Sequence, residues 1–323
     1  MVDVTSNGSI AAPTTAVARH QYVAFAVMLA LLVGAPFFIY PIFLMDALCF
    51  ALFACAFNLL VGYAGLLSFG HAMFLGSAGY LSAHAAKVWG FPPELAIVTG
   101  TATAALLGLI TGAVAIRRQG IYFAMTTLAL AQMMYFFCLE AKFTGGEDGI
   151  QRVPRGTLLG LFDLRDDLTL YWVVLAIFLF GFLLIYRTIH SPFGQVLKAI
   201  RENEPRAVSL GYKAEQYKLI AFVLSAALAG LAGSTKAIVF QLASLTDVNW
   251  PMSGEVVLMT LLGGLGTVFG PVAGAFIVVA LENYLAQLGA WVTIVQGIIF
   301  IVCVLTFRRG VIGELGRLLK KSL

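Results

Sequence analysis

Long stretches without any charged residue alternate along this chain with short charged segments. A helix rises about 1.5 Å per residue, so about 20 apolar residues cross a bilayer core about 30 Å thick. The charge-free runs are each about that long or longer, and they cover residues 22–45, 47–86, 95–116, 119–139, 168–186, 219–235, 256–281 and 283–307. Each run therefore predicts at least one membrane span.

Two of the longer runs contain glycine-rich interruptions that predict helix breaks. Gly62-Tyr-Ala-Gly65 divides the run 47–86 into two spans. In the run 256–281, Gly263-Gly-Leu-Gly266 is followed by Gly270-Pro271, and proline removes a backbone donor and disfavours helix before it. This region predicts a short helix, a break and a new helix. The pattern as a whole predicts an all-α, polytopic membrane protein with about ten transmembrane helices, some of them short or broken.

The composition agrees with this class. Hydrophobic residues make up 60% of the chain and charged residues 11%, whereas soluble domains are about 45–50% apolar and about 25% charged. These values exclude a soluble enzyme, a disordered chain and a nucleic-acid-binding protein.

The basic residues predict how the chain lies in the membrane, because they favour the cytoplasmic side. Fourteen of the 20 lie in four stretches: the N-terminal tail with Arg19, the pair Arg117-Arg118, the segment 187–218 and the tail from Arg308. An even number of predicted spans separates each pair of stretches, provided that 254–265 crosses. Both termini then face the cytoplasm. The predicted organisation is a cytoplasmic tail (1–20), a transmembrane domain (21–310) with an external loop (141–167) and a cytoplasmic loop (187–218), and a second cytoplasmic tail (311–323).

No catalytic or metal-binding constellation is present in the sequence. The four histidines are scattered, and no zinc-protease, hydrolase, CxxC or phosphate-loop motif occurs. We therefore expect no enzymatic activity, no metal and no cofactor in this chain. If it transports actively, the energy comes from a nucleotide-hydrolysing partner or from an ion gradient. Acids deep within a span would favour a gradient, but Asp46, Glu140 and Glu255 lie at predicted span ends and Glu282 late in its span.

The segment 187–218 contains a predicted amphipathic helix. Ser191-Pro192 is typical of a helix start, and Val196, Leu197 and Ile200 form one apolar stripe. Pro205 ends the helix. Such a helix either rests on the lipid headgroups or docks a cytosolic partner.

The segment 58–80 is dense in glycine. Small residues allow transmembrane helices to pack closely, which is one interpretation. In the other, the segment is bent and its unwound backbone lines a transport pathway. The residues of that pathway would be Asn58, Ser68, Gly70 and His71.

Three stretches of the chain resemble the permeases of branched-chain amino acid ABC importers. They are FNLLVGYAGLLSFGHAMFLGSAGY at 57–80, SPFGQVLKAIRENEPRAVSLGY at 191–212 and GEVVLMTLLGGLGTVFGPVAGAFI at 254–277. The resemblance covers about residues 45–310, and the loop with TGGEDGI at 144–150 is more similar to the LivM-type subunit than to its LivH-type partner.

The resemblance implies a type II-like importer permease in the bacterial inner membrane. Its partners would be a second, homologous permease subunit, two cytoplasmic ATPase subunits that hydrolyse ATP, and a periplasmic protein that delivers leucine, isoleucine or valine. The loop that couples to the ATPases would include Gly194, Ala199, Arg201, Glu202, Asn203 and Gly211. Related permeases move urea, short amides or aromatic acids. A gradient-driven secondary transporter and a channel or scaffold are the alternatives.

Overall fold

The computed structural model describes residues 15–158, 160 and 162–285, together with positions 294, 295, 297, 298, 301 and 310. Its helices are α1 (Thr15–Gly34), α2 (Pro41–Asn58), α3 (His71–Lys87), α4 (Pro93–Ala115), α5 (Ile121–Glu140), α6 (Asp167–His190), α7 (Pro192–Glu202), α8 (Glu204–Ser209), α9 (Ala214–Val239), α10 (Trp250–Gly263) and α11 (Gly270–Leu285). Four two-residue strands accompany them: β1 (Ile150–Gln151), β2 (Thr157–Leu158), β3 (Phe162–Asp163) and β4 (Leu242–Ala243). The predicted all-α class is confirmed. The C-terminal tail 311–323, most of the predicted span 283–307 and most of the N-terminal tail 1–20 lie outside the described residues.

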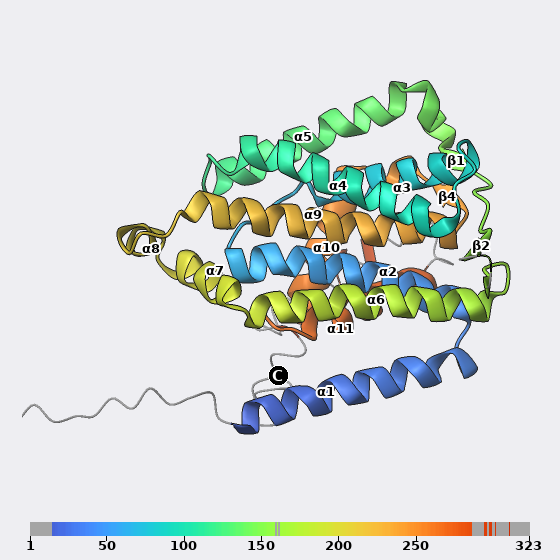
Figure 1. Ribbon diagram of the computed structural model, residues 1–323. Coiled ribbons are helices and arrows are strands. Elements are labelled where there is room, and N and C mark those ends of the chain that lie inside the picture. Colours follow the sequence, from blue (N-terminus) through green and yellow to red (C-terminus); the bar gives the residue numbers. More distant parts are fainter. Residues whose placement is uncertain are drawn as a thin grey trace, which may run out of the picture.

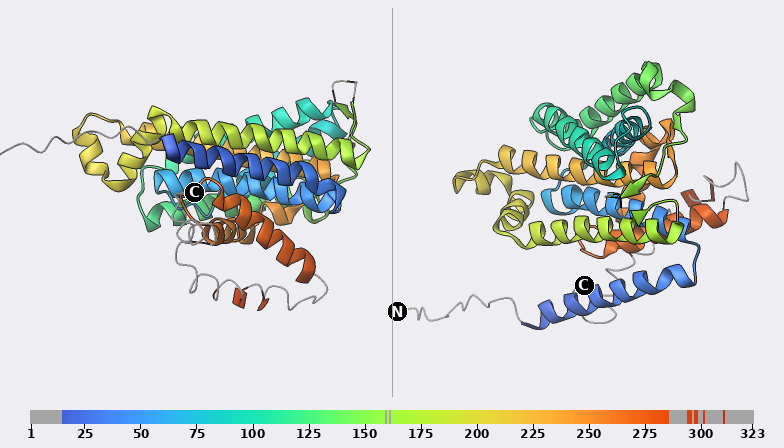
Figure 2. Two further views of the ribbon diagram at one scale, coloured as in Figure 1. Left: turned by 90° about the horizontal axis from the view of Figure 1, so that it is seen from below. Right: turned by 45° about the vertical axis from the view of Figure 1, so that its right-hand side comes forward.

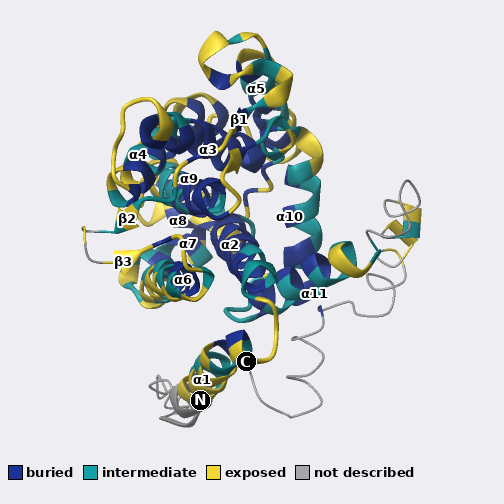
Figure 3. Ribbon diagram, turned by 90° about the vertical axis from the view of Figure 1, so that its right-hand side faces the viewer, coloured by how far each residue is buried: buried dark blue, intermediate teal, exposed yellow. Residues whose placement is uncertain are grey.

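Helix α2 is the centre of the bundle (Figure 1). It continues into a π-helical turn, Leu59–Ala64, and this 24-residue span is 89% buried over its most apolar part. Figure 3 shows α2 in the buried colour, with α6, α9, α10 and α11 around it. A helix that is apolar on every face has no side suited to water, so it lies in a core or within a membrane, in agreement with this position.

Five described helices are long and apolar enough to cross a bilayer. They are Pro41–Ala64, Pro93–Ala115, Ile121–Glu140, Asp167–His190 and Ala214–Val239. Tyr22–Phe37 and Gly270–Leu285 are shorter apolar helices. The chain is therefore a multi-pass membrane protein.

The first boundary between spans differs from the prediction. The run 22–45 is not one span, because α1 ends at Gly34 and α2 begins at Pro41 after a short 3-10 turn, Ala35–Phe37. Pro36 and Pro41 each lie in the first turn of their helix, where proline is tolerated. Asp46, predicted at a span end, lies within α2, where the ammonium of Lys236 on α9 attracts its carboxylate.

Both predicted helix breaks are present. After the π-helical turn, the chain is non-helical from Gly65 until α3 begins at His71. Helix α10 ends at Gly263 and α11 begins at Gly270, as the glycines and Pro271 predict. Both breaks lie at the same end of the bundle, since Asn58 at the end of α2 is hydrogen-bonded to the second break.

The charged loops lie at opposite ends of the bundle. Figure 1 shows α7 and α8 at one end and β1, β2 and β4 at the other. The turn after Arg118 shares the α8 end, because Gln119 Nε2 donates to Glu204 Oε2 at 3.2 Å. At the other end, β1 in the loop 141–167 pairs antiparallel with β4, with Ile150 opposite Ala243. Strands β2 and β3 form a small hairpin in the same loop.

Candidate functional site

The short helix α7 leaves the end of α6 at a tight corner. Ser191 caps α7 by accepting a hydrogen bond from the Gly194 amide at 3.3 Å. A Cβ at Gly194 would lie 2.5 Å from the Thr188 carbonyl oxygen, so glycine is required for this close approach. Leu197 and Ile200 are buried against the bundle, which confirms the predicted apolar stripe.

The end of α7 differs slightly from the prediction. Helix α7 ends at Glu202, and Asn203 caps α8 by accepting from the Arg206 amide at 3.0 Å. Pro205 therefore lies in the first turn of α8 and does not itself end α7. A buried ion pair, Lys218 Nζ to Glu204 Oε1 at 2.7 Å, joins α8 to the start of α9.

Arg201 connects α7 to the first helix break. Its guanidinium donates to the main-chain carbonyl of Gly62 in the π-helical turn. Gly65, which follows that turn, has a φ of +72°, and a Cβ there would lie 2.9 Å from Arg201 Cγ. Left-handed backbone and contact with the arginine stem both require glycine at position 65.

Asn58 connects the first break to the second. Its Nδ2 donates to the Thr267 carbonyl at 2.8 Å, and its Oδ1 accepts from the Gly266 amide at 2.9 Å. A Cβ at Gly62 would lie 2.8 Å from the Gly266 nitrogen, so the two glycine-rich breaks touch through their backbones. The three sequence stretches singled out above therefore meet at one end of the bundle.

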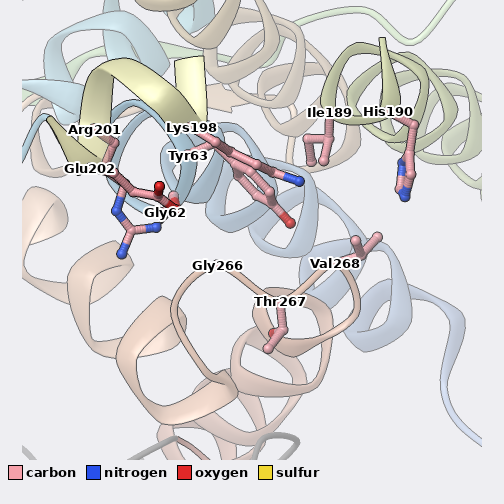
Figure 4. Close-up of a pocket in the computed structure, with 10 residues that line it drawn as sticks. All are labelled: Gly62, Tyr63, Ile189, His190, Lys198, Arg201, Glu202, Gly266, Thr267 and Val268. Atoms are coloured by element: carbon pink, nitrogen blue, oxygen red, sulfur yellow. Dashed lines mark hydrogen bonds between the residues drawn. The ribbon is translucent and has the colours of Figure 1, made fainter. Parts of the chain in front are cut away.

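A pocket of about 440 Å³ lies at this meeting point (Figure 4). We call it the basic pocket, because Lys198, Arg201 and His190 line it and Glu202 is the one acid among its described lining residues. Lys198 Nζ lies 5.5 Å from the centre of the Tyr63 ring. Figure 4 shows the Arg201 side chain next to Gly62 and the Lys198 and Tyr63 side chains running side by side.

The remaining predicted pathway residues lie away from this pocket. His71 is fully buried, and its Nε2 lies 2.8 Å from Ser225 Oγ, which donates to the Ala56 carbonyl at 2.5 Å. Because the serine proton is used on Ala56, Nε2 carries the hydrogen of the His71 ring. Phe57 and Phe74 pack edge-on to this ring.

Ser68 and Gly70 are also buried. Ser68 Oγ accepts from the Gly70 amide at 3.2 Å, and a Cβ at Gly70 would lie 2.6 Å from the Thr127 carbonyl oxygen. Of the four predicted pathway residues, the structure therefore places Asn58 beside the basic pocket and the other three in the packed interior between helices.

The predicted coupling residues divide in the same way. Gly194 is buried and Arg201, although exposed, is bonded to Gly62, so both hold α7 to the bundle. Ala199, Glu202 and Asn203 are exposed, and Glu202 also lines the basic pocket. Gly211 forms a left-handed turn with a φ of +90° between α8 and α9 and has no neighbour within 4 Å of a Cβ. The exposed residues form the face that a partner can reach.

Sequence reasoning did not identify Tyr63, Lys198, Gly266 or Thr267 as part of this site. The glycine-rich stretch 263–266 predicts a helix break, but nothing in its sequence predicts a contact with Asn58. Among the residues that the structure describes, no group of three or more histidine, cysteine, aspartate or glutamate side chains could hold a metal ion.

Comparison with known proteins gives consistent matches. A family model described as "Branched-chain amino acid transport system / permease component" matches residues 39–304. The chain is 28% identical over 263 residues to the high-affinity branched-chain amino acid transport system permease protein LivM of Escherichia coli K12, and 27% identical to the LivM protein of Salmonella typhimurium. Both alignments cover 74% of this chain and 62% of the relative.

A different cargo is named for another relative. The autoinducer 2 import system permease protein LsrC of Klebsiella pneumoniae is 28% identical over 200 residues, which are 59% of this chain and 56% of that protein. No solved structure matches the chain significantly.

Proposed function

The chain belongs to the family of branched-chain amino acid transport system permease components, and on this premise we propose that it forms half of the translocation path of an ATP-driven importer for leucine, isoleucine or valine. It is a LivM-type subunit by its similarity to the LivM proteins. It makes and breaks no covalent bond, and its partner ATPase subunits hydrolyse the nucleotide.

The observation that carries this proposal is the contact of Arg201 with Gly62. A short amphipathic helix at the end of the bundle is bonded directly to a broken transmembrane helix, and Asn58 extends the connection to a second break. Helix breaks are where a membrane protein can present unwound backbone to a substrate. A movement of α7 therefore reaches both breaks through two side chains.

The proposed mechanism follows from this connection. Closure of the ATPase subunits on ATP moves α7, whose exposed Ala199, Glu202 and Asn203 face the partner. Arg201 transmits the movement to the π-helical turn, and Asn58 transmits it to the turn at Gly266. The breaks then shift, and the cavity between the two permease subunits changes the side to which it opens.

The proposal places the protein in the bacterial inner membrane, with both termini in the cytoplasm and the loop 141–167 on the periplasmic side. The positions of the basic stretches support this orientation. Its partners are a second, LivH-type permease subunit, two cytoplasmic ATPase subunits and a periplasmic binding protein. A LivH-type permease of Methanocaldococcus jannaschii is itself 29% identical over 124 residues, which supports pairing of two homologous subunits.

Two alternatives differ in cargo or in energy source. A permease of the same family for urea, short amides or aromatic acids would share this architecture, and the LsrC relative shows that the family name does not fix the cargo. A gradient-driven secondary transporter would need an ion path. Asp46 lies in the second turn of α2 and Asp247 lies before α10, so neither acid is at the middle of a long span, which favours the ATP-driven proposal.

Reconstitution of the complete complex in vesicles tests the proposal. The chain is co-expressed with candidate ATPase and permease partners and purified through a tag on this chain alone. We expect the ATPase to co-purify, and the binding protein loaded with leucine to drive accumulation only when ATP is present. Accumulation by the chain alone under a proton or sodium gradient would overturn it. Transport of urea or an amide in place of leucine would retain the ATP-driven class and correct the substrate.

A further inference from the structure

Two apolar grooves run along α1 near the basic pocket. The first groove, of about 180 Å³, is lined by Tyr22 and Phe25 of α1, by Tyr186 and its neighbours on α6, and by Phe269. The second, of about 380 Å³, is lined by residues of α1 such as Met28 and Leu31 and by Phe269, Val272 and Phe276. The two grooves share Phe269.

The pocket and the first groove adjoin each other directly. His190 lines the pocket and Tyr186 lines the groove, and their ring centres are 4.3 Å apart. Val268 of the pocket precedes Phe269 of the grooves in the chain. A polar, basic pocket thus lies next to apolar grooves, and a ligand that occupies both has a charged headgroup and a hydrocarbon tail.

The two grooves run along helix α1. Figures 1 and 2 show α1 at the edge of the bundle, and α1 contacts α6 through the stacked rings of Phe25 and Phe182 and through the Leu32 carbonyl, which accepts from the Tyr171 hydroxyl at 2.6 Å. From Tyr22 to Leu32 the grooves follow α1 for ten residues, which is about 15 Å at 1.5 Å per residue. This length is about half of a hydrocarbon core about 30 Å thick, so it matches the acyl chains of one leaflet.

The positive charge of the basic pocket favours an anionic lipid headgroup. The three ion pairs found among the described residues involve neither Lys198 nor Arg201. One N–H of Arg201 is used on Gly62, which leaves further donors of the guanidinium for another acceptor. Basic pockets between transmembrane helices on the cytoplasmic side suit anionic lipid headgroups.

We propose that the basic pocket and the two grooves along α1 hold one anionic glycerophospholipid, with its phosphate between Lys198 and Arg201 and its acyl chains on either side of Phe269. The lipid thereby fills the grooves along α1 and contacts the residues that join α7 to the helix breaks. The inference rests on the proposed function only for its assignment to the cytoplasmic leaflet.

Native mass spectrometry of the full chain in mild detergent tests this inference without ATP or transported substrate, so its failure is separate from failure of the proposed function. The chain is titrated with phosphatidylglycerol, with phosphatidylcholine of the same acyl chains, with dihexanoyl phosphatidylglycerol and with inorganic phosphate. We expect long-chain phosphatidylglycerol to bind preferentially, with one molecule per chain.

Two variants, each with a matched control, test the headgroup site and the acyl-chain site separately. Lys198→Gln weakens phosphatidylglycerol binding about fivefold, the value of one cation near a headgroup, whereas Arg206→Gln on α8 leaves it unchanged. Ala273→Trp fills the second groove and lowers retention of the long-chain lipid, whereas Leu106→Trp on the exposed face of α4 does not.

Four outcomes overturn the inference. Equal binding of phosphatidylcholine and phosphatidylglycerol would show that the charge of the headgroup does not determine binding. Equal binding by Lys198→Gln and the parent chain would show that Lys198 does not contact the headgroup. Competition by inorganic phosphate, with no effect of Ala273→Trp, indicates a site for a free anion. Complete release of the lipid on addition of the ATPase subunits indicates that the pocket serves a protein partner.

Discussion

The guanidinium of Arg201 donates a hydrogen bond to the main-chain carbonyl of Gly62, 139 positions earlier in the chain. Because a main-chain carbonyl moves only with its helix, the bond ties the position of α7 to that of the π-helical turn after α2. The hydrogen bonds of Asn58 to the turn at Gly266 lie directly beside it. Substitutions at these positions, or in the packing around them, should therefore change transport or stability.

Replacement of Arg201 by glutamate should uncouple ATP hydrolysis from transport. A carboxylate cannot donate to the Gly62 carbonyl and repels it. A hydrogen bond to a charged group contributes about 1.5–3 kcal/mol, so we expect leucine uptake by reconstituted vesicles to fall about tenfold or more. Assembly with the ATPase subunits, measured by co-purification, should be retained.

The control for Arg201→Glu is Arg206→Glu on α8. It reverses the same charge on a neighbouring exposed position, where the main chain of Arg206 forms hydrogen bonds: its amide donates to Asn203 and its carbonyl accepts from Ser209. Uptake by the Arg206 variant should stay close to that of the parent. Equal uptake by both variants would show that Arg201 is merely a solvated residue of the loop.

Replacement of Asn58 by aspartate should destabilise the contact between the two helix breaks. The new oxygen faces the Thr267 carbonyl, which now accepts from Nδ2 at 2.8 Å. Loss of a buried hydrogen bond costs about 1–3 kcal/mol, so the midpoint of thermal unfolding in detergent should decrease.

Asn249→Asp is the control, because it makes the same amide-to-carboxylate change at a position that should tolerate it. Asn249 caps α10 through its oxygen, which accepts from the Trp250 amide at 2.8 Å, and aspartate caps helices equally well. Its unfolding midpoint should not change. A decrease of the same size in both variants would mean that the added charge, not the lost donor, is responsible.

Alanine at Gly70 and alanine at Gly254 should have opposite effects on stability. A Cβ at Gly70 would lie 2.6 Å from the Thr127 carbonyl oxygen, whereas a Cβ at Gly254 has no neighbour within 4 Å. Overpacking costs about 1–3 kcal/mol, whereas glycine to alanine within a helix gains about 0.5–1 kcal/mol. Thermal unfolding of the two variants in the same detergent measures the difference. An equally stable Gly70 variant with lost transport would support a role for Gly70 in the pathway itself.

Replacing Lys236 and replacing Asp247, which form an ion pair, should destabilise the protein by different amounts. Lys236 Nζ lies 2.6 Å from Asp247 Oδ1, and the side chains are 16% and 15% exposed. Asp46 and Glu255 also interact with Lys236. Lys236→Met therefore leaves several carboxylates without a cation, and breaking a buried pair this way costs about 3 kcal/mol or more.

Asp247→Leu should lower the unfolding midpoint less, because the charges of Asp46 and Glu255 still attract the ammonium. Midpoints of the two single variants and the double variant, measured at one ionic strength, complete the cycle. If the aspartate variant is the less stable, then Asp46 and Glu255 do not compensate Lys236.

The spans were predictable from charge-free runs because a charge inside a bilayer is costly, and most runs coincide with observed helices. The same reasoning misplaced the boundary near Asp46. Asp46 lies within α2, and the ammonium of Lys236, which is 190 positions away in the chain, attracts its carboxylate. A one-dimensional pattern contains no information on such a partner.

The candidate site was predictable in its parts but not in its assembly. Ser191-Pro192 and the apolar stripe at Leu197 and Ile200 predicted α7 correctly. The glycine-rich bend predicts His71 as a pathway residue, yet its ring is enclosed by Ser225 and by the rings of Phe57 and Phe222 from other helices. Polar residue type alone does not distinguish a buried hydrogen-bonded side chain from one that lines a path.

The sequence by itself determined the class of the protein, its helix breaks and the amphipathic helix, because these depend on hydrophobicity, on glycine and proline, and on local periodicity. The tertiary structure alone decided that Gly62, Arg201 and Gly266 meet, and that Asn58 is hydrogen-bonded to Gly266. These relationships depend on contacts between residues 139 and 208 positions apart, and such contacts arise only when α2 is enclosed by its neighbours and the two breaks are brought to the same end of the bundle.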